Sequence, residues 1–104
     1  MATQAHLTTE IESELQILAH AIDDLYQLQE DWDGDPSDPW HYSEMLAWRR
    51  NLSRLERHLD GSYRAGQMTP AQVARYRALL LRLKEAMPVI ERLGFAKPAI
   101  SLEP

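Results

Sequence analysis

Carboxylates at alternate positions in the segment 31–35 (DWDGD) are the first group of residues whose spacing suggests chemistry. Oxygen ligands at positions one, three and five of a calcium-binding loop converge on the cation in this way. The rest of that pattern is missing, because position six is Pro36 instead of Gly and position twelve is Tyr42 instead of a bidentate Glu. We interpret the segment as a solvated turn between two helices.

The four histidines lack the spacing of a metal or catalytic site. No Glu-x-x-His occurs, and the pairs His6/Glu10 and His20/Asp24 would each supply only two ligands from one helix. Cysteine is absent, as are the Gly-x-Ser-x-Gly, phosphate-loop and dinucleotide-binding patterns. These observations predict a non-enzymatic protein with no metal or cofactor.

An arginine stripe is predicted on the second helix, because Arg50, Arg54, Arg57 and Arg64 fall within a wedge of about 80° opposite its apolar seam. Guanidinium groups along one helix suit phosphates or a partner's carboxylates. Charged residues also cover the outer face of any bundle helix. The stripe therefore supports an alternative function, a nucleic-acid-binding subunit of a larger assembly, which the net charge of −5 disfavours.

An acidic surface is predicted along the first helix and the turn that follows it. Its carboxylates are expected on the outer face of the helix and would bind a basic surface on another protein. The residues are Glu12, Asp23, Glu30, Asp33, Asp35 and Asp38.

Aromatic residues bracket the same turn, with Trp32 before it and Trp40 and Tyr42 after it. Large rings at the end of a small bundle supply much of its buried area. Where they are exposed, Trp and Tyr are the side chains that most often anchor a protein partner. Both interpretations stay open, and we include these three residues in the predicted partner-binding surface.

The elements that must position these residues are three amphipathic helices. The first is predicted at about residues 9–32, where Thr9 and Glu12 fit a capping box. Its apolar residues are spaced by three or four throughout, which is the period of one helix face. They are Leu7, Ile11, Leu15, Leu18, Ile22, Leu25, Leu28 and Trp32.

The second and third helices are predicted at 39–65 and 70–93. Asp38 with Pro39 marks the start of the second, and Gly66 follows its end. The TPAQ motif at 69–72 is a capping box for the third. Pro88 predicts a kink or break in the third helix, because proline lacks the amide donor and clashes with the preceding turn.

These helices predict an all-α, antiparallel three-helix bundle, with residues 1–94 as a single domain and 95–104 as an extended tail. Charges flanking an apolar seam select which helices pair. Glu10, Asp24 and Asp31 flank the seam of the first helix, and Arg75 and Arg82 flank that of the third. We expect the two helices to dock, within one chain or across a possible homodimer.

The charge is strongly divided along the 104 residues. Residues 1–48 contain 11 carboxylates and no Lys or Arg, whereas residues 49–104 contain 11 bases and 5 carboxylates, so the two segments carry −11 and +6. The sequence has no long apolar run and no secretory leader, which predicts a cytoplasmic protein. We expect a small protein-protein interaction module, a regulator or inhibitor, that presents its acidic face to another protein.

Overall fold

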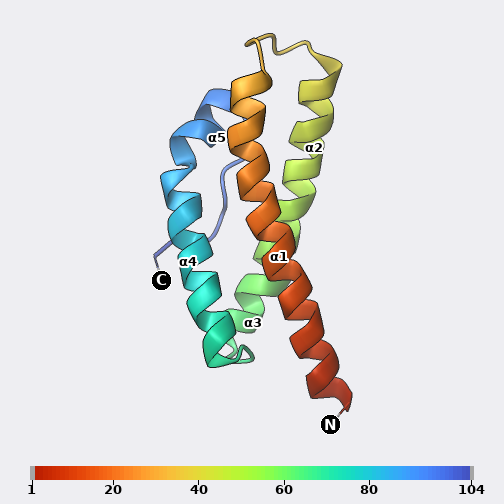
Figure 1. Ribbon diagram of the computed structural model, residues 1–104, viewed down its shortest axis with the longest axis vertical. Helices are drawn as coiled ribbons and strands as arrows, with labels where there is room; N and C mark the ends of the chain where they lie inside the picture. The colour runs from red at the N-terminus through yellow and green to blue at the C-terminus, as the bar shows by residue number, and fades with distance from the viewer. Residues whose placement is uncertain (1, 104) are drawn as a thin grey trace.

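The computed structural model describes the backbone of residues 2–103 and the side chains of residues 7–103, and its regular structure is entirely helical (Figure 1). The predicted all-α class is confirmed for this part of the chain. The expected count of three helices is not matched, because a π-helical turn and a proline divide the second and third. The elements are α1 (Ala2–Asp31), α2 (Pro39–Arg54), the π-helix η1 (Leu55–Leu59), α3 (Asp60–Arg64), α4 (Pro70–Glu85) and α5 (Met87–Leu93).

The starts of α2 and α4 follow the local signals in the sequence. The Asp38 carboxylate accepts a hydrogen bond of 3.0 Å from the Trp40 amide, and Pro39 occupies the first turn. At α4, Thr69 and Gln72 form the complete capping box. Each cap satisfies amides that have no partner within the helix.

The predicted start of the first helix at Thr9 is wrong, because α1 already begins at Ala2. Leu7 packs against the core one turn before Ile11, so burial continues through the proposed cap. Residues upstream of Thr9 also supply carbonyls to the amides that a cap would otherwise have satisfied. A capping-box pattern inside a longer amphipathic stretch therefore does not mark the start of a helix.

The predicted break near Pro88 is confirmed. The helix α4 ends at Glu85 and α5 begins at Met87, with Ala86 between them. Pro88 then lies in the first turn of α5, where its missing amide costs no helical hydrogen bond. Gly94 ends α5 at a φ of 73°, a left-handed conformation that glycine adopts without strain.

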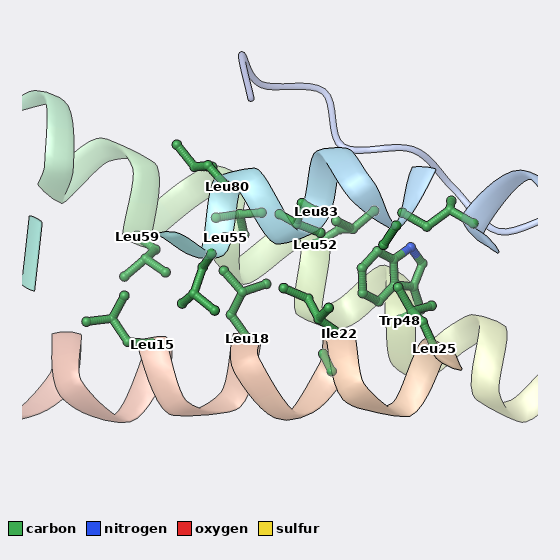
Figure 2. Close-up of a cluster of buried hydrophobic side chains, with 14 of the residues drawn as sticks. Leu15, Leu18, Ile22, Leu25, Trp48, Leu52, Leu55, Leu59, Leu80 and Leu83 are labelled. Atoms are coloured by element: carbon green, nitrogen blue, oxygen red, sulfur yellow. The ribbon is translucent and has the colours of Figure 1, made fainter. Parts of the chain in front are cut away.

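The helix α1 contacts α2 and η1 on one flank and α4 and α5 on the other (Figure 1). The molecule is elongated, with extents of 50 × 25 × 19 Å. Leucine and isoleucine side chains from α1 meet apolar side chains from the other helices along its length (Figure 2). The labelled members are Leu15, Leu18, Ile22, Leu25, Trp48, Leu52, Leu55, Leu59, Leu80 and Leu83.

Residues 95–103 are non-helical and run back along the bundle (Figure 1). Ile100 and Leu102 pack against the core. The Ala99 amide donates a hydrogen bond of 2.6 Å to the Glu56 carboxylate of η1, and Glu103 forms an ion pair of 2.6 Å with Lys84 of α4. The tail therefore covers the side of the molecule between η1 and α4.

No helix in the described part of the chain is long and apolar enough to cross a membrane.

Candidate functional site

The seam between α1 and α4 is closed by polar contacts. Glu12 forms an ion pair with Arg75, and Asp23 forms one with Arg82. The fully buried Gln72 amide donates to the other oxygen of Glu12 at 3.1 Å. The acidic α1 thus docks beside the basic α4 within one chain. Arg75 and Arg82 lie on the flank of α4 that the sequence predicted for this contact.

The carboxylates that make these contacts are not the ones expected. Glu12 and Asp23 were predicted on the outer face, and both are exposed, but they border α4 and pair with its arginines. Glu10 and Asp24 border η1 and α2. The physical reason is that α1 packs between two helical runs, so both flanks of its apolar stripe become seams. Glu30, the third residue of the predicted outer face, is exposed.

The carboxylates of the turn bind their own backbone. Asp33 accepts from the Asp35 amide at 3.0 Å, Asp35 accepts from the amide and hydroxyl of Ser37, and Asp38 caps α2. The hydroxyl and then the amide of Ser37 hold the pKa of Asp35 below its usual value. Among the residues whose side chains are described, no three His, Asp or Glu residues come together as a metal site would require. His6, one of the predicted pair with Glu10, lies outside these residues.

The aromatic residues separate into a packed group and an exposed group. Trp32 stacks on the buried His41 ring with centroids 4.2 Å apart, and it donates to the Asp35 carbonyl at 2.9 Å. Trp40 and Tyr42 are 42% and 56% exposed. Trp32 therefore belongs to the end of the core, and the other two are available on the surface.

The seam between α1 and α2 is open at its Trp40 end. A groove of about 190 Å³ there is lined by Asp24, Gln27 and Leu28 of α1 and by Trp40 and Glu44 of α2. Asp24 and Glu44 form opposite walls, and no cation in the described part of the chain pairs with either carboxylate. We name this site the acidic groove.

The opposite end of the same seam carries mixed charge. A cavity of about 240 Å³ lies between α1 and the η1–α3 segment, and one of about 350 Å³ lies between α1 and the junction of α2 with η1. Both are lined by Glu10, Glu14 and His58. Arg57 lines the first and Arg54 the second. Burial raises the pKa of Glu14, against the opposing effect of His58 and Arg54.

The arginine stripe is exposed at all four of its predicted positions. Its members nevertheless have different surroundings. Arg54 lies near Glu14, and Arg64 pairs with Asp60 at 3.0 Å and lies over the Tyr63 ring. Arg50 and Arg57 have no ion pair among the described residues.

The acidic groove brings Asp24 and Glu44 beside Trp40, a combination that the sequence analysis did not make. Glu44 follows Trp40 by four positions, so the spacing places both on one face of α2. That signal was present in the sequence. The position of Asp24 across from them depends on how α1 packs against α2, which no local pattern encodes.

Comparisons of the chain with protein-family models, with curated proteins and with solved structures find no match.

Proposed function

We propose that this chain is a non-enzymatic protein-protein interaction module that binds a basic surface of a partner through the acidic groove, with the exposed Tyr42 of the same helix as a further contact. The observation that carries the proposal is the placement of Asp24 and Glu44 on opposite walls of a groove beside the exposed Trp40 ring. A Lys or Arg side chain in this groove would meet two carboxylates and an aromatic face.

Charge balance supports a cationic ligand at this groove. A partner's cation in the groove would lie between two carboxylates that have no ion pair of their own among the described residues. The exposed Trp and Tyr rings supply apolar area at low cost in side-chain entropy. On this proposal Glu30 and Asp33 extend the acidic field around the groove, whereas Glu12 and Asp23 are occupied by α4.

Affinity capture with a matched control tests the proposal. The double variant Trp40→Ala with Glu44→Gln removes the ring and one carboxylate from the groove. Leu81→Ala is the control, because Leu81 is 47% exposed but lies on α4. We expect the wild type and Leu81→Ala to retain a protein with a basic surface, identified by mass spectrometry, that the double variant loses with unchanged helical content. Equal retention by all three would contradict the proposal.

A nucleic-acid-binding subunit is the second candidate, supported by the exposure of Arg50, Arg54, Arg57 and Arg64 along α2, η1 and α3. Binding to phosphates should weaken with salt and with each arginine removed. Mobility-shift titrations with DNA and RNA at several salt concentrations, for the wild type and for Arg50→Gln with Arg57→Gln, measure this. No shift at low salt excludes the second candidate.

We further infer that the architecture is an antiparallel three-helix bundle, in which α2, η1 and α3 together form one helix and α4 and α5 together form another. We also propose that the protein is cytoplasmic. The uninterrupted run from Pro39 to Arg64 and the single residue between α4 and α5 support this architecture. The proposed bundle leaves the α1–α2 seam as the free surface for a partner.

A further inference from the structure

The outer side of α2 and η1 lies opposite the side chains that this run buries. At 100° per residue, Tyr42, Leu46 and Arg50 fall within a wedge of about 80° on the far side of the helix from the buried Trp48. Arg57 of η1 is exposed seven positions beyond Arg50. We name Tyr42, Leu46, Arg50 and Arg57 the outer α2 face. The acidic groove lies on a different side of the same helix.

The outer α2 face carries positive charge without a carboxylate. Residues 39–59 contain only two carboxylates, Glu44 and Glu56. Glu44 lines the acidic groove beside α1, and Glu56 accepts a hydrogen bond from an amide of the C-terminal tail. Neither Arg50 nor Arg57 has an ion pair among the described residues. The chemistry of this face therefore favours an anionic partner.

The same face begins with two exposed apolar side chains. Tyr42 is 56% exposed and Leu46 is 39% exposed, and their four-residue spacing makes them neighbours on the helix. A phosphate backbone supplies charge, and nucleic-acid bases stack on aromatic rings, but neither covers an aliphatic side chain such as Leu46. A protein segment that combines carboxylates with apolar residues would cover all four members of the face.

The helix α4 shows what two arginines at this spacing bind within this protein. Arg75 and Arg82 are seven positions apart, and they pair with Glu12 and Asp23 of α1. The helix α1 is acidic and amphipathic, with buried leucine and isoleucine side chains and with carboxylates on the flanks of this apolar stripe. The outer α2 face repeats the arginine spacing of α4, and its side chains are exposed.

We propose that the outer α2 face binds an acidic amphipathic helix of another protein. Apolar side chains of that helix pack on Tyr42 and Leu46, and its carboxylates pair with Arg50 and Arg57. The distance from Tyr42 to Arg57 along the run is about 22 Å, or four turns of the bound helix. The inference goes beyond the proposed function, because the acidic groove takes a basic partner. Leu46, Arg50 and Arg57 belong to the outer α2 face alone, so the tests use these three positions.

Selection from a library of displayed helices tests the chemistry of the partner. Each helix has 25 residues, with apolar side chains on one side and Glu, Gln, Lys or Arg varied along the flanks. The bait is the full chain with Trp40→Ala and Glu44→Gln, so that the acidic groove does not select basic helices. We expect the selected flanks to be enriched in Glu. A bait that also carries Arg50→Gln and Arg57→Gln should lose this enrichment.

Fluorescence anisotropy with one selected helix, synthesised and labelled, measures the contribution of each residue. We expect Arg50→Gln and Arg57→Gln each to weaken binding about fivefold, as for an exposed ion pair. The double variant should weaken it about 25-fold, because the two sites are about 10 Å apart and their effects add. Leu46→Ala should weaken binding about tenfold through lost apolar burial.

Matched controls separate the outer α2 face from general effects of charge and hydrophobicity. Arg92→Gln removes an exposed arginine on α5, and Leu81→Ala removes a leucine on α4 that is 47% exposed. We expect both to bind the helix like the wild type. Circular dichroism establishes that every variant is folded. The selected helix with Gln in place of each Glu needs no change to the protein, and it should bind the wild type at least about 25-fold more weakly.

Three results would overturn the proposal: a selection without Glu enrichment, equal affinity of the helix for the wild type and the double arginine variant, or equal affinity of its Glu and Gln forms. Loss of helix binding in Trp40→Ala/Glu44→Gln would place the site in the acidic groove and also reject it. A single-stranded DNA of 20 nucleotides is titrated in parallel. Binding of this DNA that depends on both arginines, without selection of acidic helices, would assign the face to nucleic acid.

Discussion

The Tyr76 hydroxyl donates a hydrogen bond of 2.7 Å to the Asp60 carboxylate and so joins α4 to the first turn of α3. The Tyr76 side chain is fully buried, and Asp60 is 7% exposed. Arg64 donates to the second carboxylate oxygen at 3.0 Å. Burial, together with the hydrogen bond to Asp60, raises the pKa of Tyr76 well above its usual value, so its hydroxyl keeps the proton that it donates.

Tyr76→Phe should destabilise the protein by about 2 kcal/mol, because it leaves one oxygen of a buried carboxylate without its donor. Urea unfolding should show a lower midpoint with an unchanged slope. Tyr42→Phe is the matched control, since the Tyr42 side chain is 56% exposed, and we expect no change. A Tyr76→Phe protein as stable as the wild type would show that the hydrogen bond contributes nothing.

Gln72→Met should cost about 2–3 kcal/mol in the free energy of unfolding. The Gln72 side chain accepts from the Thr69 amide at 3.0 Å and donates to the Thr8 carbonyl at 3.3 Å and to Glu12. Methionine keeps the volume but removes these three hydrogen bonds, so the Thr69 amide and the Thr8 carbonyl lose a partner and Glu12 keeps only Arg75. Gln67→Met, at an exposed position, is the control. Equal unfolding free energies for the two variants would refute the expectation.

Gly61→Ala should stabilise the protein by about 0.5–1 kcal/mol. Gly61 lies inside α3, and a Cβ atom added there meets no atom within 4 Å. Alanine therefore lowers the entropy of the unfolded chain without a clash in the folded state. Gly66→Ala is the contrasting variant, because the Gly66 φ of 70° lies in the left-handed region, and we expect a loss of about 1 kcal/mol. Thermal unfolding of both variants measures the difference in sign.

Glu14→Gln should increase stability at neutral pH and have little effect in acid. Burial raises the pKa of Glu14 above its ordinary 4.5, with Arg54 and His58 opposing the shift and Glu10 adding to it. The folded state then binds the Glu14 proton more tightly than the unfolded state does, so this group destabilises the protein as pH rises from 4.5 through the folded pKa. Glutamine lacks this ionisation.

The measurement is the difference in unfolding free energy between Glu14→Gln and the wild type across that pH range. The difference should be near zero below the ordinary pKa and should favour the variant above the folded one. Exposed Glu30→Gln serves as the control. A difference between Glu14→Gln and the wild type that does not change with pH would contradict the raised pKa.

Local sequence signals predicted the parts of the fold that local forces determine. Asp38, Pro39 and the Thr69–Gln72 box act within one turn of helix, and the structure confirms each of them. The Pro88 break follows from a missing amide and is equally local. The start of α1 was misjudged because the Thr9–Glu12 pattern lies inside a longer amphipathic helix that begins at Ala2.

The contacts between distant segments could not be predicted in the same way. Periodicity indicates which residues lie on a flank but not which helix borders that flank, so the ion pairs of the exposed Glu12 and Asp23 with α4 were not predicted. The packing of Ile100 and Leu102 depends on a surface built by the folded helices. The partner-binding role of the acidic groove stays a prediction.

The α1–α4 seam also has a consequence for synthesis on the ribosome. Glu12 and Arg75 are 63 positions apart in the chain, and Asp23 and Arg82 are 59 apart. At typical rates of translation, about 3–12 s pass between the synthesis of the two sides of this seam. Until α4 is synthesised, α2 and η1 are the helices available to cover the apolar stripe of α1, so the flank that α4 covers in the folded protein lacks its partner for this interval.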